Sequence, residues 1–263
     1  MRSLNRRRWL AIGLASVLLV GLPSIVAASH SWGGYHWART SNPFTLQLDD
    51  NVSSAWDGYL AKASSDWTKS SVLHTKVAIG TSNPRKCRAT LGRVEVCNAG
   101  YGNTGWLGVA QIWITGGTHI VQGTVKVNDT YFNTSTYNTP AWRQMVMCQE
   151  IGHTFGLDHQ DENFTNTNLG TCMDYTNDPS GTAGTNGTLA NTSPNQHDYD
   201  ELGIIYLHLD STTTVGAVVA SSPSLDGSDW GRQVRVSKDG RTSVFTKADG
   251  HGNAIITYVT WAD

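Results

Sequence analysis

Four polar residues and a glycine between positions 149 and 159 are the strongest candidates for chemistry in this chain. Gln149 and His153 are four residues apart, so on a helix they share one face. Two ligands at this spacing can hold one metal ion, and Glu150 beside the first can reach a water molecule on that metal. Gly156 can turn the chain so that His159 returns as a third ligand and a fourth position stays open, as a catalytic zinc site requires. Zinc lowers the pKa of such a water, and the carboxylate takes its proton.

This stretch resembles the zinc motif of the metzincins, H-E-x-x-H-x-x-G-x-x-H followed by a methionine turn. Glu150, His153, Gly156 and His159 match the motif, whereas Gln149 stands where the family has its first histidine. The resemblance implies an exported zinc-dependent endopeptidase that acts on a protein or peptide substrate. His153 and His159 are then the metal ligands, Gln149 is a provisional third, and Glu150 is the general base that later protonates the leaving amine.

A counterpart of the methionine turn follows at residues 172–175, with Met173 placed 14 residues after His159. In metzincins a methionine underlies the zinc. In the astacin and serralysin branches a tyrosine two residues later reaches the metal region, and Tyr175 occupies that position. The resemblance therefore implies that Tyr175 donates to a developing oxyanion, with an ordinary core tyrosine as the alternative. It covers about residues 43–208.

Gln149 leaves the function open, because a neutral amide oxygen is a weaker zinc ligand than an imidazole. In the first interpretation, Gln149 binds zinc and the enzyme works. In the second, another residue replaces the missing histidine, although His197 reads more simply as part of a helix. In the third, the site is degenerate and the chain is a non-catalytic extracellular binding protein. The remaining histidines show no ligand-like spacing: His30, His36, His74, His119, His208 and His251.

The elements around the motif predict an α+β fold. Thr139 and Pro140 are typical of the start of a helix, which should run to about Phe155 and end at Gly156. A second helix is predicted over 52–69 and a last one from Ser193-Pro194 to about His208. Strands are predicted over 44–48, 75–79, 88–97, 105–114, 120–128, 233–236, 242–245 and 255–261.

The resemblance implies a metzincin-like domain over 29–210, with a twisted mixed sheet, an active-site helix and the methionine turn. The strand at 107–114 would be the sheet edge that pairs with an extended substrate. Residues 211–263 are predicted to form a small C-terminal β appendage. The loop at 161–193 is rich in Asp and Asn, but no spacing in it is specific for calcium.

Four cysteines allow three disulfide pairings, and sequence order favours Cys87–Cys97 and Cys148–Cys172. The resemblance supports the second bond, because a metzincin packs its methionine turn beneath the active-site helix. That bond would close a loop of roughly 25 residues, which is worth about 3 kcal/mol in the chain-entropy model.

Residues 1–28 are typical of a secretory signal peptide, with a basic start, an apolar stretch and small residues at Val26-Ala27-Ala28. A retained membrane anchor is the alternative, and the paired arginines leave Sec and twin-arginine export both open. Cleavage would give a secreted chain with no membrane span and a formal charge of −6, since 1–28 hold four of the 19 basic residues and none of the 21 acidic ones. Such a chain is a poor candidate for binding nucleic acid or an anionic membrane. The oligomeric state is not determined by the sequence.

Overall fold

A computed structural model describes residues 30–184, 186–218 and 225–262. The signal peptide predicted at 1–28 lies outside these residues. Among those the model describes, no helix has the length and apolar character needed to cross a membrane. Both expected disulfides are confirmed: the Cα atoms of Cys87 and Cys97 lie 6.0 Å apart, and those of Cys148 and Cys172 lie 5.9 Å apart. Such bonds are typical of proteins that fold outside the cytoplasm.

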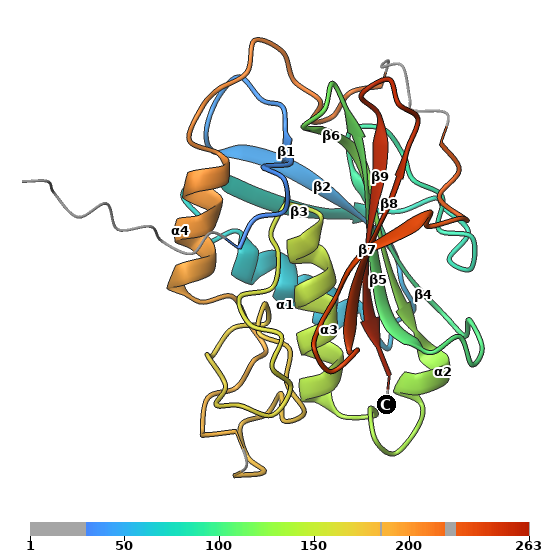
Figure 1. Cartoon of the computed structure of the whole chain (residues 1–263), viewed down its shortest axis with the longest axis vertical. Helices are drawn as coiled ribbons and strands as arrows, with labels where there is room; N and C mark the ends of the chain where they lie inside the picture. The colour runs from blue at the N-terminus through green and yellow to red at the C-terminus, as the bar shows by residue number, and fades with distance from the viewer. Residues whose placement is uncertain (1–29, 185, 219–224, 263) are drawn as a thin grey trace, which may run out of the picture.

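One large sheet runs through the molecule (Figure 1). Its strand order is β3-β2-β4-β6-β5-β9-β8-β7, and the short β1 also pairs with β6. The strands are β1 (His36–Trp37), β2 (Phe44–Asn51), β3 (Leu73–Ile79), β4 (Val94–Ala99), β5 (Trp106–Thr115), β6 (His119–Asn128), β7 (Arg232–Val236), β8 (Thr242–Ala248) and β9 (Ala254–Trp261).

The sheet is mixed. Strands β1, β2, β3, β4 and β6 pair in parallel, whereas β5, β7, β8 and β9 join by antiparallel pairing. The predicted α+β class is therefore confirmed. The strand expected at 88–97 begins later than predicted, because Gly92 adopts a positive φ of 79° and regular pairing starts only at Val94.

The helices are α1 (Asp57–Trp67), α2 (Asp129–Phe132), α3 (Pro140–His153) and α4 (Gln196–Ile205). The start of α3 is as predicted: the Thr139 hydroxyl accepts a bond from the Trp142 N–H, and Pro140 opens the helix. The predicted cap of α4 at Ser193-Pro194 is wrong. Asn195 caps the helix instead, since its side chain and that of Asp198 form a reciprocal capping box.

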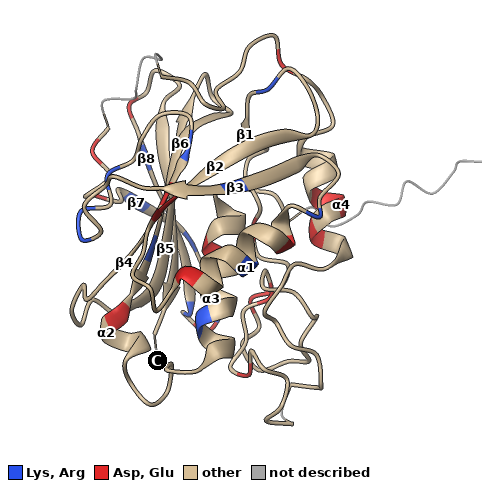
Figure 2. Ribbon diagram, turned by 180° about the vertical axis from the view of Figure 1, so that it is seen from behind, with Lys and Arg blue, Asp and Glu red and all other residues tan. Residues whose placement is uncertain are grey.

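Helices α1 and α3 pack against each other and cover one face of the sheet (Figure 1). The buried Trp67 of α1 donates its indole N–H to the carbonyl of Cys148 in α3, over 3.1 Å. Charges of both signs share α1 and α3, and α4 carries acidic residues (Figure 2). This packing fixes the orientation of α3 and therefore the directions in which its side chains point.

The C-terminal strands continue the same sheet. β9 lies between β5 and β8, and pairs with β5 from Trp106↔Trp261 to Ile114↔Ala254. The expectation that the strand at 107–114 forms a free edge is therefore wrong for this chain. Its hydrogen-bonding edge is already used by residues that the sequence assigned to an appendage.

Candidate active site

Two glycines shape the end of α3. An added Cβ at Gly152 would lie 2.7 Å from the Met173 sulfur and 2.8 Å from a ring carbon of Trp67, so only glycine lets the methionine turn pack this closely. Gly156 has a φ of +94°, and a Cβ there would lie 2.0 Å from the Tyr35 carbonyl oxygen. The sharp turn predicted at Gly156 is confirmed, and it sends the chain back past the helix.

This turn brings His153 and His159 together. Their Nε2 atoms lie 3.1 Å apart, and the two rings meet edge to face with centroids 4.6 Å apart. His153 is fully buried and His159 nearly so. Burial, followed by the neighbouring His159, holds the pKa of His153 well below its usual range. His153 is therefore held neutral, which is the form that binds a metal ion.

The other nitrogen of each ring has an acceptor beside it. His153 Nδ1 lies 2.9 Å from the Leu157 carbonyl oxygen, and His159 Nδ1 lies 3.1 Å from Glu162 Oε1. A carbonyl oxygen only accepts, so His153 carries its proton on Nδ1 and presents the lone pair of Nε2 to His159. A carbonyl and a carboxylate in these positions are the usual partners of metal-binding histidines.

Glu162 is itself held in place by three groups. It accepts from Thr242 Oγ1 over 2.8 Å, and an Arg235 nitrogen lies 3.3 Å away. Burial alone would raise the pKa of Glu162, but the bond from His159 and the positive charges of His159 and Arg235 lower it to about 2. Arg235 also binds Asp158 through both of its terminal nitrogens. Beside this group lies a hollow of about 770 Å³ that Arg235, Lys238 and Arg241 line from one side.

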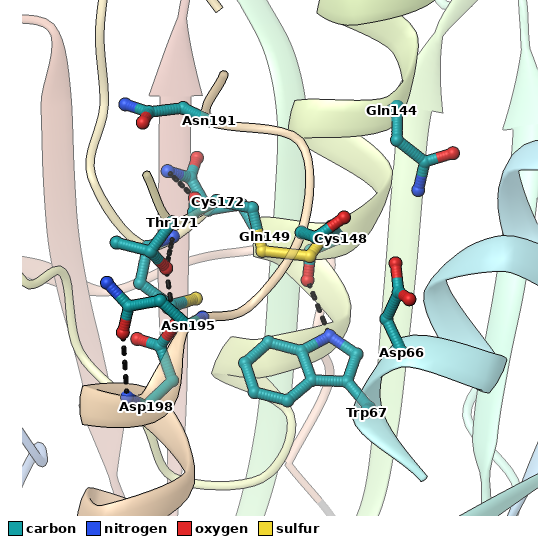
Figure 3. The surroundings of a disulfide bond; sticks show 12 residues. Asp66, Trp67, Gln144, Cys148, Gln149, Thr171, Cys172, Asn191, Asn195 and Asp198 are labelled. Carbon is teal, nitrogen blue, oxygen red and sulfur yellow. Dashed lines mark hydrogen bonds between the residues drawn. A yellow bond between two sulfur atoms is a disulfide. The ribbon is translucent and has the colours of Figure 1, made fainter. Parts of the chain in front are cut away.

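Gln149 points elsewhere, as Figure 3 shows. Its amide nitrogen donates to the Cys172 carbonyl over 3.0 Å, and its amide oxygen accepts from Thr260 Oγ1 over 3.0 Å. Within the described residues, no hydrogen bond joins Gln149 to His153 or His159. The sequence placed all three side chains on one metal ion, whereas the structure brings only the two imidazoles together.

Glu150 lies between α3 and β5. A Cβ on Gly108 of β5 would come within 2.4 Å of Glu150 Oε1, so this glycine makes room for the carboxyl group. Glu150 Oε1 lies 2.7 Å from Thr260 Oγ1, while Oε2 is buried without a hydrogen-bond partner among the described residues.

The protonation of Glu150 follows from these contacts. Burial raises its pKa to about 8, although the Thr260 bond opposes the shift. The Thr260 hydroxyl has one hydrogen and lies near two acceptors, Gln149 and Glu150. Both contacts are satisfied when Glu150 is protonated and donates to Thr260, which then donates to Gln149. In this arrangement the predicted general base is held in its neutral form.

Strand β9 covers the site through two further contacts. The Tyr258 ring stacks on the His153 ring, with centroids 4.2 Å apart and an interplanar angle of 2°. The Tyr258 hydroxyl is buried and has no partner within the part of the chain described. The Tyr175 hydroxyl donates to the Trp261 carbonyl over 2.9 Å, so it already contacts a peptide carbonyl of β9. Thr260, Tyr258 and Trp261 were missed by the sequence analysis, since their role depends on strand pairing over more than 100 residues.

The remaining candidates are separate from the histidine pair. The ring nitrogen of His197 lies 2.9 Å from that of His30, and these two rings stack on each other. A substitute ligand at position 197 therefore finds no support. The loop at 161–193, in which the sequence showed no spacing specific for calcium, uses its amide side chains to hold its own conformation. Its buried Asn168, Asn186 and Asn191 side chains bond mainly to the loop's own backbone and side chains.

Comparison of the chain with models of known protein families finds no match, and comparison with characterised protein sequences finds no significant similarity. The case for a function therefore depends on the geometry of the site.

Proposed function

We propose that this chain is an exported zinc-dependent endopeptidase of the metzincin type, in a form whose substrate edge is covered by its own strand β9. The observation that carries the proposal is the histidine pair. Two buried Nε2 atoms converge to 3.1 Å while acceptors hold both Nδ1 atoms, and the carboxyl group of Glu150 lies on the same helix. A metal ion between the two imidazoles would use the lone pair that the Leu157 contact leaves on His153 Nε2.

The surroundings support the same family. Met173 packs beneath α3 at Gly152, and the bond between Cys148 and Cys172 ties the methionine turn to the helix. The pair fits zinc as two of its ligands. Gln149 does not yet fit as a third, because its amide oxygen faces Thr260. For Gln149 to act as the predicted third ligand, its side chain must turn toward the histidines. This requires that its hydrogen bond with Thr260 breaks first.

In the proposed reaction, zinc supplies Lewis acidity when bound between His153 and His159. Glu150 accepts a proton from the attacking water and passes it to the leaving amine. Tyr175 donates its hydroxyl hydrogen to the substrate carbonyl, as it does to the Trp261 carbonyl here. Strand β5 pairs with the extended peptide as it now pairs with β9.

In this proposal, β9 covers the substrate-binding edge of the protein's own sheet. It occupies the edge of β5, and its Thr260 bonds to Glu150 in a way that suits a protonated carboxyl group. Substrate can pair with β5 only after β9 leaves. Loss of the Thr260 contact then also frees Glu150 to ionise and Gln149 to turn toward the histidines.

The test is cleavage of an unfolded protein substrate by the zinc-loaded chain. Glu150→Ala should slow cleavage by about 100-fold or more while zinc stays bound, because it removes a base and not a ligand. Gln149→His should raise zinc affinity about tenfold or more, since imidazole replaces a weak amide ligand. Gln144→His, on the same helix but outside the site, is the matched control and should leave zinc affinity unchanged. Zinc-saturated protein that cleaves no better than its Glu150→Ala variant would contradict the proposal.

A second candidate is a non-catalytic extracellular binding protein on the same scaffold. It is favoured by the full engagement of Gln149 with Thr260 and Cys172, which leaves the first ligand position without a ligand atom turned to the metal. Under this reading the purified chain lacks zinc at His153 and His159, and replacing Glu150 changes nothing in a cleavage assay.

A further inference from the structure

Four side chains from three distant segments meet where β1 runs beside the start of β6. His36 lies on β1 and is the register partner of His119, the first residue of β6. His208 and Asp210 belong to the segment after α4, drawn in orange in Figure 1. These histidines have no ligand-like spacing along the chain, but the fold brings three of them beside one carboxylate.

The metal-binding atoms of these residues point at one another. His119 Nε2 lies 3.2 Å from Asp210 Oδ1, and His36 Nε2 lies 3.6 Å from the same oxygen. His208 Nε2 lies 3.2 Å from His36 Nε2 and 3.6 Å from Asp210 Oδ1. Ligand atoms at the corners of a zinc tetrahedron, with bonds of about 2.0–2.1 Å, are separated by about 3.3–3.4 Å. Four of the six edges are measured here and bracket that value, and the ligand atoms of His36, His119 and Asp210 all lie within 4.8 Å of one another.

Neighbouring groups hold two of these ligands in the required orientation. His36 Nδ1 lies 2.8 Å from the Gly34 carbonyl oxygen, so that nitrogen carries the proton and Nε2 keeps its lone pair. Asp210 Oδ2 accepts from the Arg39 guanidinium over 3.0 Å and from the Arg39 backbone N–H over 3.1 Å. This leaves Oδ1 to face the three imidazoles.

We propose that His36, His119, His208 and Asp210 form a second zinc site, separate from the histidine pair of α3. Three imidazoles and one carboxylate are a tetrahedral donor set typical of zinc, and four protein ligands make a closed, structural site. The ion would tie β1, the start of β6 and the segment after α4 to one point. The proposal is independent of the proposed peptidase function, because none of its residues contributes to the candidate active site.

The same three segments are also joined without a metal. Thr214 Oγ1 accepts from the Ala38 N–H over 3.0 Å and donates to the Ile120 carbonyl over 2.6 Å. The cluster can therefore be altered without removing every tie between the segments. His119 and His208 are the best positions for replacement, since their side chains are 33% and 56% exposed, against 5% for His36.

The alternative is a hydrogen-bonded cluster that binds no metal. Because His36 Nε2 carries no proton, its contact with His208 then requires a proton on His208 Nε2. The two readings differ in what zinc does to the protein. A metal site gains stability from added Zn²⁺, whereas a hydrogen-bonded cluster does not.

The test uses the full chain with His159→Ala, which removes the histidine pair as a competing site. This variant should still bind about one Zn²⁺ per chain, and saturating Zn²⁺ should raise its Tm by about 5–10 °C. Adding His119→Ala or His208→Ala should lower zinc affinity by about 100-fold or more and abolish the rise in Tm. With Co²⁺ in place of zinc, the d–d absorption of a tetrahedral site should appear and then vanish in the same variants.

His251→Ala, at an exposed histidine outside the cluster, is the matched control and should keep the zinc, the Tm rise and the Co²⁺ spectrum. A folded His159→Ala protein that binds no stoichiometric Zn²⁺ would overturn the proposal. Zinc binding that survives His119→Ala together with His208→Ala would overturn it too. Neither result bears on the proposed peptidase. The histidine pair is tested separately, by measuring the zinc content of the His119→Ala variant, in which His159 is intact.

Discussion

The two histidine groups of this chain differ in how they are built and how they are covered. The pair formed by His153, the last residue of α3, and by His159 comes from a short stretch of chain, is almost completely buried and packs against Tyr258 of β9. The cluster around Asp210 draws on segments more than 170 residues apart and keeps His208 about half exposed. The first group has two ligand nitrogens that face each other, and the Glu150 carboxyl group contacts Thr260. The second has four ligand atoms and no candidate base.

This difference separates a site arranged for chemistry from one arranged for stability. A catalytic zinc site needs an incomplete ligand set and a nearby base, and Glu150 is the residue that we propose as the base. A structural site needs a complete set, and Asp210 completes the three imidazoles. Coverage by β9 adds a barrier to the first group that the second does not have.

The largest expected contrast is the rate of zinc release. In the two proposals, an ion between the nearly buried His153 and His159 would lie against the Tyr258 ring of β9, whereas an ion at the Asp210 cluster would lie beside the half-exposed His208. We expect zinc transfer to a coloured chelator to show two phases that differ by about 100-fold, the slow phase coming from the buried pair. His159→Ala should remove the slow phase and His119→Ala the fast phase. Two phases of equal rate would remove the distinction between the sites.

The contrast also explains what the sequence could predict. The pair on α3 is local, so helical periodicity and the glycine turn at Gly156 place His153 and His159 together without knowledge of the sheet. The helix itself, its Thr139 cap and the bond from Cys148 to Cys172 were predicted for the same reason, since each depends on neighbouring residues or on the resemblance.

The remaining features of the fold and the site depend on strand pairing, which no local sequence pattern predicts. Alternation identified 255–261 as a strand, but which neighbour it joins depends on chain closure over more than 100 residues. The same closure turned Gln149 toward Thr260 and brought His36 beside His208. Ligand spacing along the chain therefore found one histidine group and missed the other.

A smaller effect should appear in the pH dependence of stability without metal. The pKa of Glu150 is raised by burial from about 4.5 to about 8, so the folded chain favours its protonated form. That contribution is complete below about pH 4.5 and is lost as pH rises toward 8. With a chelator present, Glu150→Gln should therefore raise the free energy of unfolding by about 2 kcal/mol at pH 9 and by much less at pH 5. Denaturant melts at both pH values measure this.

Asp210→Asn should have the opposite sign. Burial would raise the pKa of Asp210, but the bond from the Arg39 backbone N–H, the neighbouring imidazoles of His36 and His119 and the Arg39 guanidinium lower it. The stabilisation is present above its unfolded-state pKa and is lost as pH falls through the folded-state value, so the substitution should destabilise the chain at neutral pH. Asp57→Asn, at an exposed position in the first turn of α1, is the control and should change neither profile.

The same control applies to the Glu150 prediction. Equal shifts in Glu150→Gln and Asp57→Asn would argue that Glu150 is not held protonated.

The smallest of these effects, about tenfold, concerns the covering strand itself. Thr257 lies in the middle of β9, buried between β5 and β8, whereas Gln233 lies on the edge strand β7, which pairs with β8 alone. Proline removes one backbone donor, an effect that an edge strand tolerates and a central strand does not. Thr257→Pro should loosen β9, free the edge of β5 and raise zinc-dependent cleavage about tenfold. Gln233→Pro should leave the rate near that of the wild type. Because general unfolding would also expose the chain, the gain must disappear when Glu150→Ala is added and must be accompanied by retained near-ultraviolet circular dichroism. A loosened β9 without any gain in cleavage would mean that the strand is part of a binding scaffold and not a cover over an enzyme.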